Sequence, residues 1–160
     1  MNSNVPQFIP LPMATTTHLP AASASVPLEP AVLQQSHALL RVLFTAVPMV
    51  AGADKFTGFL ADWETYLNPL VLNVVPVSAA TFMLLVGIIE IVAGILVFLR
   101  PRIGGWVVMA WLLAIALQLM VWGRFLDIAV RDIVIALSGP LLLARLTPLV
   151  AGRAVGRAVA

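Results

Sequence analysis

The sequence contains no cysteine among its 160 residues. This absence excludes disulfides, thiol relays, zinc–thiolate sites and cysteine-bound iron–sulfur clusters within the chain. Histidine is almost as scarce: there are two, His18 and His37, and His18 lies in a proline-rich segment, so paired histidine ligation of a haem is not expected. Nothing in the sequence resembles a nucleotide-binding loop, a hydrolytic triad or a metal cage. We predict no metal site and no certain cofactor.

Charge is also in short supply. Charged residues make up 10% of the chain and hydrophobic residues 61%, with a mean hydropathy of +1.04. Soluble domains carry about 25% charged residues, so this chain has too few polar side chains to cover a surface that faces water. We therefore predict an integral membrane protein whose main partner is the lipid bilayer. The net charge of +2 is too small to indicate binding to nucleic acid.

The first 30 residues lack lysine and arginine and are rich in proline, and the first basic residue is Arg41. A secretory signal needs a positively charged start and an uninterrupted apolar core, and this segment has neither. It predicts a disordered, proline-rich cytoplasmic tail over residues 1–30. A docking arm for a partner subunit is the alternative.

Long apolar runs dominate the rest of the chain. Each run approaches the ~20 residues that an α-helix needs to cross the hydrocarbon core of a bilayer. The sequence predicts an all-α fold, an integral membrane four-helix bundle formed by residues 31–148. The predicted spans are 36–56, 79–99, 103–122 and 127–146.

The connection between the first two spans is too long for a simple turn. Within TGFLADWETYLNP, apolar and aromatic residues recur at helical spacing and the acids face elsewhere, which predicts a short amphipathic helix at the membrane interface that ends at Asn68-Pro69. The helix could be an interfacial anchor or a lid over a site between the spans.

Basic residues are distributed unevenly over the predicted connections. Arginines gather on one side of the membrane, and acids accompany Lys55 and Arg124 on the other. The positive-inside rule then places both termini in the cytoplasm. We predict that the protein lies in the inner (cytoplasmic) membrane. Residues 149–160 form a basic cytoplasmic tail in this prediction. The arginines of the cytoplasmic side are Arg100, Arg102, Arg145, Arg153 and Arg157.

Ionisable residues occur inside the predicted spans. A charge at the centre of a bilayer costs ~2.5–3.5 kcal/mol even on lenient scales, so such residues are expected to face the bundle interior and to find partners. Gly87, Glu90 and Gly94 share one helical stripe, and the two glycines allow a neighbouring helix to approach the carboxylate closely. Glu90 is therefore predicted to point inward.

Heights along the spans suggest a partner for Glu90. With Ser36 and Leu99 at the cytoplasmic edge, Arg41 lies ~8 Å and Glu90 ~14 Å above it, so we predict an Arg41–Glu90 ion pair. A second polar layer is predicted nearer the outer side, formed by Asp54, Lys55, Gln118, Arg131 and Asp132.

Simpler interpretations of these residues stay open. The Arg41–Glu90 pair could fix helix register without binding any ligand. Asp54, Lys55, Arg131 and Asp132 could be solvated charges at the outer rim, and Gln118 could serve only to bridge helices.

The chain resembles the DoxX-like membrane proteins, small four-helix bundles of bacteria and archaea. The resemblance rests on LLRVLF and AGADKF in the first span, GIIEIVAG in the second and AVRDIVIAL in the fourth, and covers roughly residues 39–146. It implies a subunit of a membrane-bound redox assembly, because relatives include a subunit of a thiosulfate:quinone oxidoreductase and a partner of thiol-detoxifying enzymes. Such a role favours a non-catalytic accessory subunit over an enzyme.

Three functions remain open at this point. In the first, a redox-associated subunit binds a quinone: Glu90 or Asp132 is the candidate proton acceptor and catalytic group, and Arg41, Lys55 or Arg131 stabilises negative charge. The remaining candidate ligand-binding residues are Asp54 and Gln118. In the second, a homo-oligomer or a complex with a partner transports small solutes or protons. In the third, the chain anchors a partner such as an oxidoreductase subunit to the membrane.

Overall fold

A computed structural model describes residues 29–159 of the chain. The predicted proline-rich tail, residues 1–30, lies almost wholly outside the described residues. The described part is all-helical and contains no strand, and four of its helical spans are long and apolar enough to cross a membrane. The fold class predicted from the sequence is therefore confirmed.

Three helices span without interruption. They are α1, Pro30–Asp54, α3, Ala79–Leu99, and α4, Pro101–Trp122. Proline occupies the first turn of α1 and α4, where its missing N–H has no helical partner to lose. Ser78 caps the start of α3, because its hydroxyl accepts a hydrogen bond from the Thr81 amide at 3.2 Å. Gly123 ends α4 in the left-handed region, with φ of 74°.

The fourth span is built from two helices, α5, Leu126–Ser138, and α6, Pro140–Val159. They meet at Gly139, where Pro140 cannot supply the amide that would continue the α5 hydrogen bonds. Together they form one apolar span from Leu126 to Ala154. The helix runs on through most of the segment predicted as a separate C-terminal tail.

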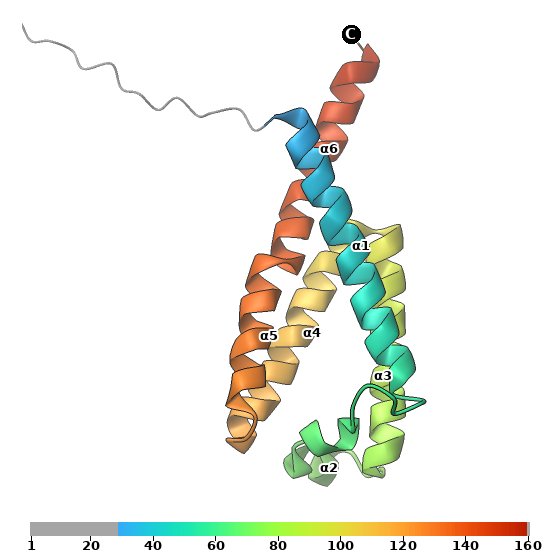
Figure 1. Cartoon of the computed structure of the whole chain (residues 1–160), viewed down its shortest axis with the longest axis vertical. Helices are drawn as coiled ribbons and strands as arrows, with labels where there is room; N and C mark the ends of the chain where they lie inside the picture. The colour runs from blue at the N-terminus through green and yellow to red at the C-terminus, as the bar shows by residue number, and fades with distance from the viewer. Residues whose placement is uncertain (1–28, 160) are drawn as a thin grey trace, which may run out of the picture.

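The helices form a bundle around two apolar clusters. In Figure 1, α1 and α3 run side by side, and α4 lies between α3 and the α5–α6 pair. One cluster joins Ala93 and Val97 of α3 to Val108 of α4 and Leu143 of α6. The other joins Ala116 and Leu119 of α4 to Ala129 of α5. The outward side chains of these helices are apolar and exposed, as expected for a surface that faces lipid.

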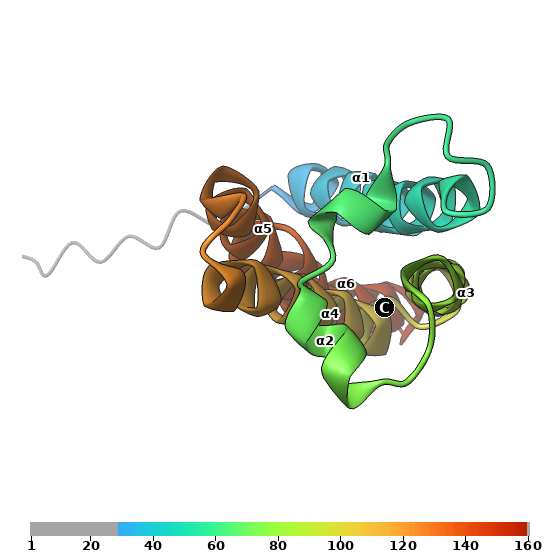
Figure 2. The same cartoon turned by 90° about the horizontal axis from the view of Figure 1, so that it is seen from below.

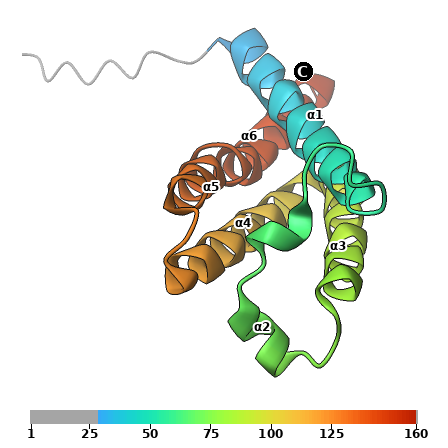
Figure 3. The same ribbon diagram turned by 60° about the horizontal axis from the view of Figure 1, so that its bottom comes forward.

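The two ends of the bundle differ. At one end, the first turns of α1 and the last turns of α6 project together beyond the α3–α4 turn (Figure 1). We call this the arginine end, after Arg100 and Arg102 in that turn. At the other end, a 3₁₀ helix η1, Trp63–Tyr66, and the short helix α2, Pro69–Val74, lie across the helix ends (Figures 2 and 3). We call this the loop end.

The loop end differs in detail from the prediction. One amphipathic helix ending at Asn68-Pro69 was expected, but these residues begin α2 instead. The Asn68 side chain accepts a hydrogen bond from the Leu70 amide at 2.9 Å, and Pro69 takes the first helical position. An Asn-Pro pair is compatible with both a helix end and a helix start, and here the start prevails.

Candidate functional site

The central feature of the site is an ion pair between α1 and α3. Nζ of Lys55, in the turn that ends α1, lies 2.5 Å from Oε2 of Glu90, and the two side chains are 4% and 10% exposed. Glu90 faces inward as its spacing predicts, because Gly52 and Gly87 bring the two helix backbones together beside it. Two opposite charges are thus held in contact in a largely dehydrated setting.

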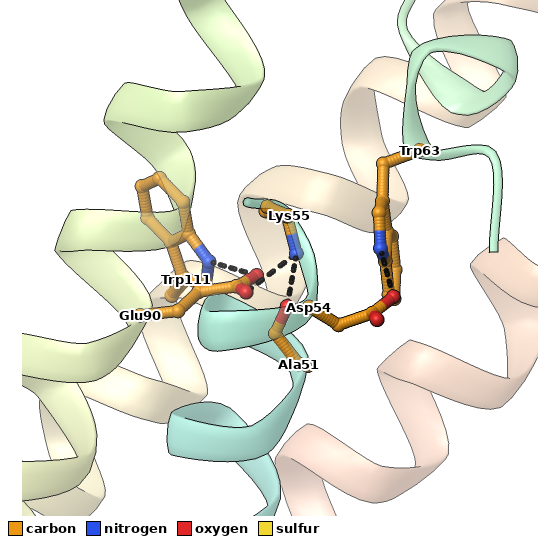
Figure 4. A network of polar contacts seen from close by, with 6 residues as sticks. All are labelled: Ala51, Asp54, Lys55, Trp63, Glu90 and Trp111. Atoms are coloured by element: carbon orange, nitrogen blue, oxygen red, sulfur yellow. Dashed lines mark hydrogen bonds and ion pairs between the residues drawn. The ribbon is translucent and has the colours of Figure 1, made fainter. Parts of the chain in front are cut away.

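Two tryptophans enclose this pair (Figure 4). The Lys55 ammonium lies 3.8 Å from the centroid of the Trp63 ring, a cation–π distance. On the other side, the Trp111 indole N–H donates a hydrogen bond to Oε1 of Glu90 at 3.4 Å. The carboxylate therefore has a cation on one oxygen and a neutral donor on the other, and the ammonium is covered by an aromatic face.

Asp54 holds the loop that carries Trp63. Its buried carboxylate accepts hydrogen bonds from the Thr57 hydroxyl, from the amides of Phe59 and Leu60, and from the Trp63 indole at 2.8 Å. These donors come from one short segment that follows the end of α1. Asp54 is thus a positioning residue that aims the Trp63 ring at Lys55.

Gln118 fastens the next part of the loop to α4. Its amide donates to the Tyr66 carbonyl at 3.0 Å and accepts from the Asn68 backbone amide at 3.1 Å, while the Asn68 side chain donates to the Gln118 carbonyl. Tyr66 also packs edge-on against Phe125, with ring centroids 5.0 Å apart. The hydrogen bonds of Gln118 therefore join α4 to the loop. They do not join two membrane spans, which was the alternative that the sequence left open.

The predicted Arg41–Glu90 pair is wrong. Arg41 donates through Nε to the Phe98 carbonyl at 3.1 Å and its guanidinium carbon lies 5.2 Å from the centre of the Phe98 ring. Arg41 is therefore level with the last turn of α3, although the height estimate placed it ~6 Å above Phe98. Helix α1 begins earlier than predicted. Relative to the predicted heights it is displaced along α3 by about one turn, and this displacement brings Lys55 to Glu90.

Arg131 and Asp132 have a separate location on α5. Asp132 is buried, and its closest cation is its neighbour Arg131, with Nε 3.4 Å from Oδ1. The Arg131 side chain is 63% exposed. The structure thus brings Asp54, Lys55 and Glu90 together, whereas Arg41, Gln118 and the Arg131–Asp132 pair each have partners of their own.

The two tryptophans were not among the residues that the sequence singled out. The sequence predicts only an interfacial position for the segment that contains Trp63, and it assigns no role to Trp111. Trp111 lies in the middle of α4, whereas tryptophans of membrane helices concentrate at the ends, and a buried indole N–H needs a partner. That position is the signal that could have found it.

A shallow hollow of about 330 Å³ adjoins the site at the loop end. Lys55, Trp63 and Met83 contribute to its walls, together with the acids Asp62 and Glu64. Among residues 29–159, no group of three or more acidic or histidine side chains is arranged to hold a metal ion. The hollow therefore offers one buried cation, two acids, an aromatic ring and apolar side chains.

A scan against protein-family models found no match, and searches of the curated proteins and of the solved structures found none either.

Proposed function

We propose that this protein is a DoxX-like subunit of a redox system in the cytoplasmic membrane, and that it binds a quinone beside the Lys55–Glu90 pair. The observation that carries the proposal is this buried pair, enclosed by Trp63 and Trp111 and adjoined by a hollow. The orientation proposed with it places both termini in the cytoplasm and the loop end outside, because the arginines gather at the opposite end.

The chemistry of a quinone suits these residues. Its reduction takes up two electrons and two protons and places negative charge on the ring oxygens. Lys55 would donate a hydrogen bond to one ring oxygen, where its positive charge stabilises the charge that develops. The Glu90 carboxylate would accept a proton from water and pass it to a ring oxygen as negative charge develops there. The indoles of Trp63 and Trp111 offer flat faces against which a ring can stack.

The electrons must come from another protein. The chain has no cysteine and therefore no thiol that could carry these electrons. The proposal therefore includes a partner oxidoreductase subunit that holds its own redox group, with this chain as the accessory subunit that holds the quinone.

Binding of short-tailed quinones to the purified protein in nanodiscs tests the proposal. We expect saturable binding that is lost in Lys55→Met and weakened in Glu90→Gln, since each variant removes one group that contacts the ring. Asp127→Asn changes an exposed acid of the same end and should bind as the native chain does. Equal binding by the native chain, Lys55→Met and empty nanodiscs would reject the quinone site.

A second function, docking of the partner, is supported by the projecting ends of α1 and α6. At ~1.5 Å per residue, the 34 residues from Leu126 to Val159 measure ~50 Å, well beyond the ~30 Å of a hydrocarbon core. His37 of α1 and Thr147 of α6 are joined by a hydrogen bond of 3.1 Å within this projection.

Removal of residues 149–160 should abolish co-purification of an oxidoreductase under gentle extraction while leaving quinone binding intact. Retention of the partner would exclude this docking surface.

A further inference from the structure

The surroundings of the Lys55–Glu90 pair are different on its two sides. Toward the loop end, the hollow of about 330 Å³ is lined in part by Lys55, the residue whose ammonium contacts Glu90. A water molecule has a share of ~30 Å³ in the liquid, so the hollow has room for several waters. Its acids, Asp62 and Glu64, are exposed to the surrounding water.

Toward the arginine end, close apolar packing begins one turn from Glu90. Ala93 and Val97 of α3 pack with Val108 and Leu143, and side chains of α1 and α4 surround them: Leu40, Phe44 and Leu112. Val97 and Leu143 are fully buried. An apolar cluster of this kind gives water no hydrogen-bonding partner and stays dry.

Glycine contacts tighten this region further. A β-carbon on Gly94 would lie 2.7 Å from the Thr45 carbonyl of α1, and one on Gly105 would lie 2.7 Å from the Pro140 carbonyl of α6. The Phe44 ring occupies the space beside Gly139. Helices α1, α3, α4 and α6 are therefore in direct backbone or ring contact on this side of the pair.

We infer that the Lys55–Glu90 pair exchanges water, protons and small solutes with one aqueous phase only, the phase at the loop end. The inference goes beyond the proposed function, because it fixes the side of access whatever ligand binds. In the quinone system, protons would then enter and leave at the loop end. It also opposes the transport alternative in this conformation, because a permeation path would have to cross the apolar cluster.

The absence of cysteine makes the inference directly testable, because any introduced cysteine is the single thiol of the chain. Glu90→Cys is reconstituted into proteoliposomes and treated with a small, charged methanethiosulfonate that cannot cross the bilayer, either from outside or enclosed within. Two reference variants report the orientation: Phe59→Cys, whose native residue is 89% exposed at the loop end, and Arg102→Cys at the arginine end.

We expect Glu90→Cys to lose its free thiol from the side on which Phe59→Cys reacts and to keep it from the side on which Arg102→Cys reacts. Val97→Cys, inside the apolar cluster, should keep its thiol from both sides. Modification of Glu90→Cys from the arginine end, or from neither side while Phe59→Cys reacts, would overturn the inference.

A second variant guards against failure of Glu90→Cys to fold with an unpaired lysine. Lys55→Cys combined with Glu90→Gln leaves no charge at either position of the pair. The same sidedness is expected, and the same outcomes overturn the inference. Because the labelling requires no quinone, failure of the quinone-binding test leaves this result interpretable, and the reverse holds as well.

Discussion

Gly52 of α1 and Gly87 of α3 face each other across the interface that carries the site: a β-carbon on either would lie 2.6 Å from the carbonyl oxygen of the other. Contact this close is available only to residues without side chains, and it sets the spacing of α1 and α3 where Lys55 reaches Glu90. The interface therefore depends on glycine at two positions that belong to different spans.

Gly87→Ala tests this interface. Overpacking against the Gly52 carbonyl should cost about 1–3 kcal/mol, which exceeds the gain of up to about 1 kcal/mol in helix propensity. Gly152→Ala is the matched control, because a β-carbon there meets open space and only the propensity gain applies. Thermal unfolding in detergent should show a lower Tm for the first variant and an unchanged or higher Tm for the second. Equal shifts in the same direction would contradict the interface.

Because Lys55 and Glu90 are in contact, substitutions at the two positions should have strongly coupled effects on the free energy of unfolding. Lys55→Met leaves a buried carboxylate without its cation and should reduce the free energy of unfolding by about 3–5 kcal/mol. Lys55→Met combined with Glu90→Gln should restore part of this loss, because no unpaired charge remains. A double-mutant cycle by chemical denaturation measures the coupling, and additive effects of the two substitutions would show that the side chains are not in contact.

Substitution of Asp54 should lower the stability of the loop rather than that of the bundle. Asp54→Asn replaces one carboxylate oxygen with an N–H₂ group, which then faces either the Phe59 amide at Oδ1 or the Trp63 indole at Oδ2. Hydrogen bonds to a charged group contribute about 1.5–3 kcal/mol each. Limited digestion with chymotrypsin should cleave this variant faster within residues 57–63. Asp62→Asn, at an exposed position in the same loop, should be cleaved as the native chain is. Identical cleavage of all three would exclude the role of Asp54.

Substitution of Gln118 should destabilise α2 locally. Gln118→Leu removes the partners of the Tyr66 carbonyl and the Asn68 amide, and each unsatisfied buried group costs about 1–3 kcal/mol. Amide hydrogen exchange of residues 66–74 should become faster, while exchange in the middle of α3 stays unchanged. Asn73→Ala alters an exposed residue of α2 and serves as the control. Unchanged exchange in Gln118→Leu would show that other contacts hold the loop.

Much of this fold could be predicted from the sequence, because the dominant physical constraint is visible there. Apolar runs of about 20 residues define spans, Ser78 marks a helix start, and the Gly87–Glu90–Gly94 stripe marks the face that packs. The partner of Glu90 could not be predicted in the same way. It depends on how far α1 is displaced along α3, and that displacement follows from the contact of Gly52 with Gly87, which heights counted within each span do not contain.

The loop end shows a second reason. The arrangement of residues 55–78 follows from hydrogen bonds between residues far apart in the sequence, such as those of Asn68 with Gln118. Local periodicity indicated one amphipathic helix, but a buried carboxylate and a side-chain amide reorganise the segment into η1 and α2. Trp111 gains its role from its own long-range contact with Glu90, and Trp63 gains its role from the folding of the loop around Asp54.

Trp63 and Trp111, which enclose the Lys55–Glu90 pair, are two of the four tryptophans in the chain. Indole emission is sensitive to nearby charge, so half of the tryptophans of this protein are in contact with the same buried ion pair. The native, unlabelled molecule therefore carries its own optical reporter, and any ligand or proton that disturbs the pair should register in its fluorescence spectrum.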